Sequence, residues 1–288
     1  MDKGNQATAQ ETARTRWLTQ APLPRSYSDY VGRKIFRFLM TVHGLGAFAL
    51  ITFGVIFTKL RTARSVTTPL IFHELARSGL RLLPMFLFMS AALGLVVIGQ
   101  TVSWLTRVGA ANSFLGPIMV LVVVRELGPL FTALLVLSRS GTGNVIELGT
   151  ARALGEVEAL ESMSIDPVHY LVMPRVIGMA LGVFSLTVFF IIGAILSGYL
   201  WAFLQNVPLR PGDYFEQLAR ALSGLDFAIL AVKSFLFGTV IAIITCYHGL
   251  SQPLQLSEVP AATIRAVAQS IIACVLVDAI FIFTYLLV

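Results

Sequence analysis

Long apolar runs separated by short polar stretches dominate the chain. Neither residues 82–103 nor residues 176–204 contain a charged side chain. A helix of about 20 apolar residues crosses the roughly 30 Å hydrocarbon core of a bilayer, so these runs predict membrane-spanning helices. Six apolar segments of this kind occur, at about residues 38–58, 82–103, 114–138, 171–204, 227–250 and 266–288.

The first apolar segment differs from the others because basic residues flank it on both sides. Lys34 and Arg37 precede residues 38–58, and Lys59 and Arg61 follow them. A crossing at this point would place one basic cluster on the translocated side, against the positive-inside rule. We therefore expect residues 38–58 to form a helix along the cytoplasmic interface and the other five segments to span the membrane.

Five crossings from a cytoplasmic N-terminus also sort the basic residues of the loops. Residues 139–170 and 251–265 are then cytoplasmic, residues 104–113 and 205–226 lie outside, and so does the C-terminus. The only basic residues on the outer side would be Arg107, Arg210 and Arg220. The predicted fold class is an all-α integral membrane protein with an N-terminal interfacial helix and five transmembrane helices.

The N-terminal region differs in composition from the rest of the chain. Residues 1–32 are polar and contain no apolar core of a cleavable signal, so we expect a cytoplasmic and disordered segment. Residues 33–288 form the predicted membrane domain.

Composition excludes several other classes of protein. Apolar residues make up 56% of the chain and charged residues only 12%, which is unlike a water-soluble domain. The net charge of +6 comes from basic residues that bracket apolar runs, so it indicates a membrane surface and no nucleic acid. Cys246 and Cys274 lie inside apolar runs, and the histidines show no ligand spacing, so we predict no disulfide, metal site or catalytic centre.

The chain also lacks the residues needed to hydrolyse ATP. A Walker A loop needs Gly-Lys-Ser/Thr, and no lysine here follows a glycine. We therefore expect a protein that is not an enzyme, holds no cofactor, and depends on another chain for any ATP hydrolysis.

Four charged residues fall within the apolar segments: Arg125, Glu126, Lys233 and Asp278. Each costs about 2.5–3.5 kcal/mol at the centre of a membrane helix, so we expect them to face the protein interior and pair. Two roles remain open, a buried ion network that fixes helix register and a direct part in substrate passage. A proton relay is a third possibility.

A cytoplasmic stretch between the third and fourth segments has the pattern of an amphipathic helix. Over residues 144–165 apolar residues recur every third position, and Asp166-Pro167 predicts its end. Arg152 and Glu156 form a potential i,i+4 pair. The excess of acidic residues favours a protein partner over anionic lipid headgroups. The polar residues of this predicted helix and its end are Glu147, Arg152, Glu156, Glu158, Glu161 and Asp166.

Five short motifs in this order resemble the MlaE/YrbE family, the permeases of ABC lipid transporters that work with Mce-domain proteins. The motifs are Arg125-Glu126-Leu127-Gly128-Pro129, Glu147-Leu148-Gly149-Thr150, Glu158-Ala159-Leu160-Glu161-Ser162-Met163, Asp166-Pro167 and Pro174-Arg175-Val176. The resemblance runs from about residue 80 to the end.

The resemblance implies a homodimeric permease in the bacterial inner membrane. It also implies that residues 144–165 form a coupling helix on cytoplasmic ABC ATPase subunits, which bind the ATP. The implied substrate is phospholipid, moved between the inner membrane and a periplasmic Mce-domain protein to maintain outer-membrane lipid asymmetry or supply. Glu126, Lys233 and Asp278 match family positions. Two other interpretations are a proton-coupled secondary transporter using Glu126 and Asp278, and a structural anchor for an envelope complex.

Overall fold

The computed structural model describes residues 25–59, 64–108, 116–204, 211–250 and 255–287. The chain divides into two compact units, Met1–Ala47 and Phe48–Val288. Every regular element among the described residues is helical, which confirms the predicted all-α class. The longer helices are α2 (Arg25–Lys59), α3 (Arg64–Ser78), α4 (Leu83–Val108), α9 (Met173–Leu204), α11 (Gly224–Leu250) and α12 (Val259–Leu287).

Shorter helices complete the chain. Two of them, α6 (Gly128–Val136) and α7 (Thr142–Ala153), continue one another through a π-helical turn. The remaining elements are the 3-10 helices η1 (Leu80–Leu82) and η5 (Leu256–Glu258), the π-helices η2 (Val120–Leu127), η3 (Leu137–Gly141) and η4 (Val168–Val172), and the α-helices α8 (Glu156–Ser162) and α10 (Pro211–Ala221).

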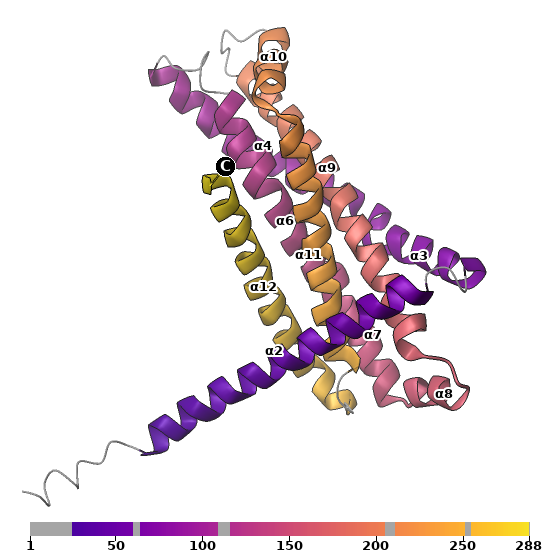
Figure 1. Cartoon of the computed structure of the whole chain (residues 1–288). Coiled ribbons are helices and arrows are strands. Elements are labelled where there is room, and N and C mark those ends of the chain that lie inside the picture. The colour runs from indigo at the N-terminus through magenta and orange to yellow at the C-terminus, as the bar shows by residue number, and fades with distance from the viewer. Residues whose placement is uncertain (1–24, 60–63, 109–115, 205–210, 251–254, 288) are drawn as a thin grey trace, which may run out of the picture. The chain divides into compact units, whose positions relative to one another are not determined.

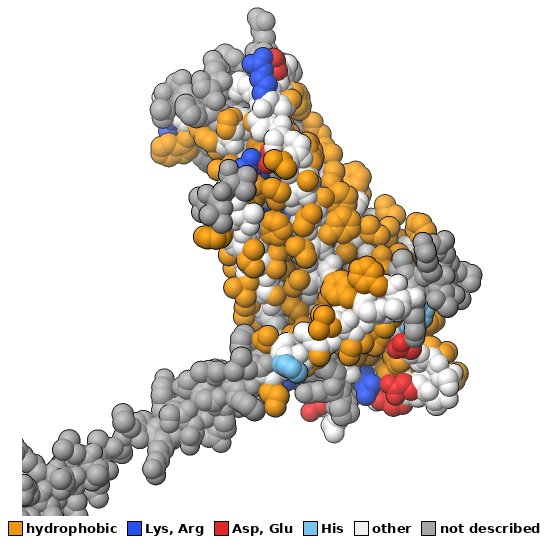
Figure 2. Space-filling view, viewed as in Figure 1, with side chains coloured by type: hydrophobic (Ala, Val, Ile, Leu, Met, Phe, Trp, Pro, Cys, Tyr) orange, Lys and Arg blue, Asp and Glu red, His pale blue; other side chains and the backbone are white. Residues whose placement is uncertain are grey.

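Six helical stretches among the described residues are long and apolar enough to cross a membrane, so the chain is a multi-pass membrane protein. They are Met40–Thr58, Thr68–Leu105, Gly116–Ala153, Val168–Trp201, Gly224–Leu250 and Leu256–Tyr285. Five of them overlap the five predicted spans, and the first overlaps the segment predicted to lie at the interface. In Figure 2, hydrophobic side chains cover the middle of the second unit, and most of the visible charged side chains lie toward its ends.

Small residues allow the helices of the second unit to approach closely. A Cβ atom on Gly94 of α4 would lie 2.2 Å from the carbonyl oxygen of Ala194 in α9, and one on Gly198 would lie 2.4 Å from Ile98. Without a hydrophobic driving force between helices in lipid, such close packing is a main source of their association. Glycine is therefore required where α4 and α9 cross.

A second close contact joins α11 to α9. A Cβ atom on Gly238 would lie 2.6 Å from the Cα of Ala180, and the rings of Phe184 and Phe235 stack with centroids 5.0 Å apart. The helix α9 thus packs against both α4 and α11. Figure 1 shows α9, α11 and α12 running between the end that carries α8 and the end that carries α10, with α4 in the half toward α10. The C-terminus lies toward the α10 end.

Sequence periodicity missed the helices α3 and α10. The signal for α10 was Pro211 in its first turn, with Tyr214 and Leu218 on one face. Both of these side chains are buried. The Tyr214 hydroxyl donates to the carbonyl oxygen of Ile195 at 3.3 Å, and burial raises the pKa of its phenol to about 12.

Two predicted boundaries need correction. The helix α2 begins at Arg25, and in the sequence Tyr27, Tyr30 and Val31 already have helical spacing. The boundary predicted at residue 32 therefore falls inside a helix. Residues 1–24 lie outside the described residues. The predicted single helix over residues 144–165 is wrong, because Gly155 adopts a left-handed conformation (φ 78°) that separates α7 from α8.

Candidate functional site

Lys233 is the centre of a polar cluster inside the bundle. Its ammonium nitrogen lies 3.0 Å from Glu126 Oε2 and 2.7 Å from Asp278 Oδ1, and it donates to the carbonyl oxygen of Arg125 at 2.9 Å. The Lys233 side chain is only 1% exposed. One lysine therefore joins three segments, η2, α11 and α12, through charges that could not stay unpaired in an apolar interior.

The π-helical geometry of η2 explains the backbone contact. The amide of Gly128 bonds to the carbonyl oxygen of Val123, five residues earlier, and the turn between them contains Arg125 and Glu126. A π-turn breaks the regular ladder of helix hydrogen bonds and is frequent at functional sites. Lys233 supplies a donor to one carbonyl of this turn, so it stabilises both the charge pairs and the local backbone.

Arg125 does not join the ion pairs of Lys233. Its Nε lies 2.8 Å from Oδ1 of Asp226, and its guanidinium lies 4.9 Å from the ring centre of Tyr285. Asp226, whose side chain is 2% exposed, is also held by the backbone amide and hydroxyl of Ser223. Sequence reasoning missed Asp226 because it stands at the start of an apolar run, in the first turn of α11.

A cavity of about 320 Å³ opens beside this second ion pair. Its surface is mostly apolar, with Leu225, Ile229 and Phe281 among the lining side chains. The Arg125–Asp226 pair supplies the charged part of the wall, and Ser223 and Thr284 also line it. An apolar cavity with a few placed polar groups is the usual form of a ligand site. This arrangement suits an amphipathic molecule.

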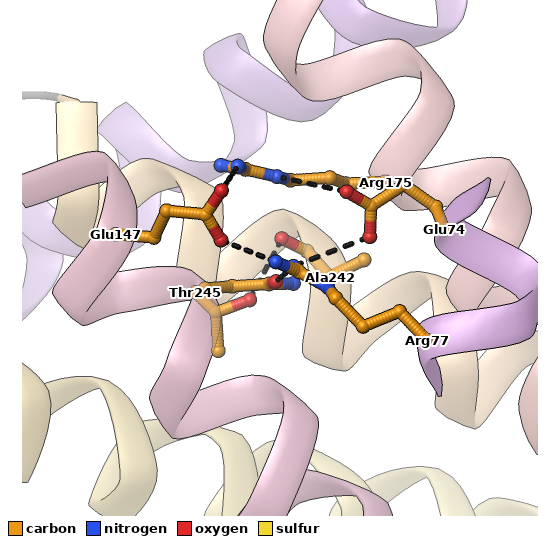
Figure 3. Close-up of polar contacts among 7 residues, drawn as sticks. Glu74, Arg77, Glu147, Arg175, Ala242 and Thr245 are labelled. Carbon is orange, nitrogen blue, oxygen red and sulfur yellow. Dashed lines mark hydrogen bonds and ion pairs between the residues drawn. The ribbon is translucent and has the colours of Figure 1, made fainter. Parts of the chain in front are cut away.

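A second polar cluster, the Arg77 cluster, lies where α3, α7 and α9 meet. Its members are Glu74, Arg77, Asn144, Glu147 and Arg175. Figure 3 shows the two arginines and two glutamates alternating around a ring, with each arginine facing both carboxylates. Sequence reasoning named Glu147 but assigned it to a docking surface; the signal it missed was the i,i+3 pair of Glu74 and Arg77.

The other residues of the predicted coupling helix lie around the break at Gly155. Arg152 Nε pairs with Glu158 Oε1 at 3.2 Å across the turn, instead of with Glu156 as its spacing suggested. Glu156 and Glu161 are exposed, and Asp166 Oδ1 accepts a hydrogen bond from the amide of Val168 at 3.0 Å. The acidic residues from Glu147 to Glu161 thus lie on α7 and α8, the two helices joined by the turn at Gly155 and here called the α7–α8 hairpin (residues 142–162), and Asp166 follows α8.

The hairpin also carries apolar surface. Leu154 and Met163 are both 61% exposed. A hollow of about 290 Å³ lies between the two helices and η4, lined in part by Val157, Leu160 and Tyr170. The α7–α8 hairpin therefore offers exposed apolar side chains bordered by acidic ones, and an apolar centre with a polar rim is typical of protein-binding surfaces.

Within the described ranges, no group of three or more His, Cys, Asp and Glu side chains could hold a metal ion. The apolar helices define a multi-pass membrane protein with two clusters of ion pairs among its helices. The family model described as Permease MlaE matches residues 71–284, and the chain belongs to this permease family.

Curated relatives agree with this family. The chain is 30% identical over 243 residues to a protein of Rickettsia felis named "Probable ABC transporter permease protein", covering 84% of this chain and 91% of the relative. It is 34% identical over 168 residues to a probable ABC transporter permease of Synechocystis, covering 57% and 62% of the two chains. It is also 30% identical over 211 residues to Arabidopsis thaliana Protein TRIGALACTOSYLDIACYLGLYCEROL 1, chloroplastic, covering 72% and 58%.

Proposed function

We propose that the chain is the membrane subunit of an ABC transporter that moves phospholipid between the bacterial inner membrane and a periplasmic Mce-domain protein, for outer-membrane lipid asymmetry or supply. Membership of the MlaE permease family supports the class of transporter. The observation that carries the substrate class is the apolar cavity with the Arg125–Asp226 ion pair in its wall. The name of the Arabidopsis relative includes the name of a glycolipid, trigalactosyldiacylglycerol, and this agrees with a lipid substrate.

The size of the cavity favours a homodimer. About 320 Å³ lies at the lower end of the range for drug-sized ligands, so one chain could enclose only part of a two-chain lipid. Much of α12 faces outward with apolar residues, including Ile272, Leu276 and Ile280. Two copies that meet near this helix would enlarge the cavity and cover its open side.

ATP hydrolysis belongs to separate cytoplasmic subunits in this proposal. The α7–α8 hairpin, with exposed Leu154 and Met163 beside exposed glutamates, is the surface on which they would dock. ATP binding by these partners would displace the hairpin and reshape the lipid cavity. The permease itself contributes no catalytic residue and no cofactor.

The orientation follows from the distribution of basic residues. The N-terminus and the α7–α8 hairpin are placed in the cytoplasm, and α10 and the C-terminus in the periplasm. The first apolar stretch, Met40–Thr58, is then an interfacial helix rather than a sixth crossing. An alkaline phosphatase fused after Val288 should be active, since the enzyme folds only outside the cytoplasm; an inactive fusion on a stable chain would indicate six crossings.

A proton-coupled transporter is the main alternative. It would need Glu126 or Asp278 to take up and release protons during transport. Both carboxylates are paired with Lys233, which favours a fixed ion network over a proton relay.

Transport in vesicles separates the two mechanisms. The permease, reconstituted with its ATPase, should move labelled phospholipid only when ATP is supplied, and an uncoupler should have no effect. Movement that needs a proton gradient and continues without any ATPase would refute the proposal.

A further inference from the structure

Helix α7 is held by two different kinds of contact. On one side it packs by apolar side chains and close backbone approach: Val145 lies against Ala262 and Ala266 of α12, and a Cβ atom on Gly249 of α11 would lie 2.7 Å from Leu148. Toward α3 and α9, the described contacts of α7 are mainly those of charged and amide side chains. The Arg77 cluster is therefore the principal direct link between α7 and these two helices.

The geometry of this link is closed and specific. Glu147 of α7 accepts from Arg77 through one oxygen and from Arg175 through the other, at 2.8 Å for the Arg175 contact. Glu74 lies 3.2 Å from Arg77 and 3.6 Å from Arg175, and Arg77 also donates to Asn144 Oδ1 at 2.5 Å. Arginine can bond two carboxylates at once through its planar fork, so the relative positions of three helices are encoded in one ring of charges.

The helices on the far side of this link form a rigid pair. A Cβ atom on Gly178 of α9 would lie 2.7 Å from the Cβ of Glu74 in α3, and one on Gly182 would lie 3.3 Å from Ser78. Packed interiors transmit displacement because they have little free space. A displacement delivered to Glu74 or Arg175 therefore moves α3 and α9 together, and α4 follows α3 through Gly79 and η1.

We propose that the Arg77 cluster is the mechanical connection by which movement of the α7–α8 hairpin reaches α3, α4 and α9, with Arg77 as its positioning residue. This inference rests on the proposed function, in which the hairpin receives the ATPase. The inference gives Arg77, Glu74 and Asn144 a role in coupling ATP hydrolysis to transport and gives them no role in binding lipid.

The cluster is buried at Arg175 and Glu74 and more open at Glu147, whose side chain is 50% exposed. Arg175 is 5% exposed, so its ion pairs are only weakly screened by solvent and persist as the helices move. Two buried donors, Arg175 Nη1 and Asn144 Nδ2, have no hydrogen-bond partner within the described part of the chain. The cluster thus has donors available for a second arrangement of the same charges.

The test compares ATP hydrolysis and lipid transport in the complete transporter reconstituted in vesicles. Arg77→Gln, Glu147→Gln and the double variant form a double-mutant cycle, and Arg81→Gln, at an exposed position nearby, is the matched control. We expect Arg77→Gln to lower the number of lipids moved per ATP by roughly 3–10-fold, a coupling typical of residues in one ion network. The double variant should be no worse than the poorer single variant.

A purely structural role predicts a different result. It would lower the thermal midpoint and the yield of Arg77→Gln but leave the lipids moved per ATP equal to the wild-type value, and that outcome would overturn the inference. If Arg77→Gln cannot be purified, Arg77→Lys serves instead, because lysine keeps the positive charge but loses the two-pronged guanidinium. Arg77→Lys should give a number of lipids moved per ATP between those of the wild type and Arg77→Gln. A wild-type number would refute the proposal.

The two levels of the proposal fail separately. If the wild-type complex moves no lipid with ATP, the proposed function is wrong. If the wild-type complex moves lipid with ATP and the Arg77 variants keep its ratio, only the assignment of the Arg77 cluster is wrong.

Discussion

Replacing Lys233 by methionine removes the positive charge of its cluster while keeping a long, unbranched side chain. The Lys233 side chain is 1% exposed, and its ammonium group contacts two carboxylates and one carbonyl within 3.0 Å. Removing one partner from a buried ion pair costs about 3–5 kcal/mol, because the remaining charge is left without compensation. At 2–4 °C per kcal/mol for a domain of similar size, the thermal midpoint should fall by about 6–20 °C.

The assay is thermal unfolding of the purified protein in detergent, followed by size-exclusion chromatography. Arg220→Met is the control, since the Arg220 side chain is 77% exposed and its pair with Glu216 should contribute at most about 1 kcal/mol. Adding Glu126→Gln and Asp278→Asn to Lys233→Met should restore most of the stability, because it neutralises both orphaned carboxylates.

Two results would refute this reasoning. One is a midpoint for Lys233→Met within 2 °C of the wild type, which would mean that the carboxylates need no counter-charge. The other is a triple variant as unstable as the single one, which would place the cost in packing instead of charge. Transport by a stable triple variant would further show whether the cluster only fixes helix register or takes part in substrate passage.

Three further predictions concern packing, backbone and ionisation. Gly94→Ala places a methyl group 2.2 Å from the Ala194 carbonyl oxygen and should lower the free energy of unfolding by about 1–3 kcal/mol. Its control, Gly143→Ala, meets nothing within 4 Å and should be neutral or stabilising. Equal thermal midpoints for the two variants would contradict the close crossing of α4 and α9. Gly155→Ala should cost about 1–2 kcal/mol because φ is 78°, and an unchanged midpoint would argue against the break between α7 and α8. Burial raises the pKa of Tyr214 to about 12, so the contribution of its neutral phenol to stability is complete below pH 10 and lost as the pH rises through 12. Tyr214→Phe has no phenol to ionise and should unfold less readily than the wild type over that range. Phenolate absorbance from Tyr214 near pH 10 would contradict this prediction.

Hydrophobic patterning predicted the membrane helices well because their length and composition are imposed by the bilayer. It also singled out Glu126, Lys233 and Asp278, since a charge in an apolar run must find a partner. The structure places these three side chains together, while their role in transport stays a prediction.

The rest of the two clusters depends on contacts that no local pattern records. Arg77 and Glu147 are 70 positions apart in the sequence, and nothing in either neighbourhood indicates that α3 and α7 meet. Asp226 resembles an ordinary residue of a first helical turn until Arg125 is placed beside it. A glycine directly after the apolar Leu154 is a signal for the end of a helix at Gly155. The apolar periodicity continues on both sides of Gly155, however, and it predicted one continuous helix.

The most direct test of the account is purification of the tagged chain from its native membrane, with protein identification and lipid mass spectrometry on the same sample. We predict recovery of two copies of the chain with an ABC ATPase, an Mce-domain protein and bound phospholipid. Recovery of the chain alone, free of lipid and active in vesicles under a proton gradient, would contradict the account.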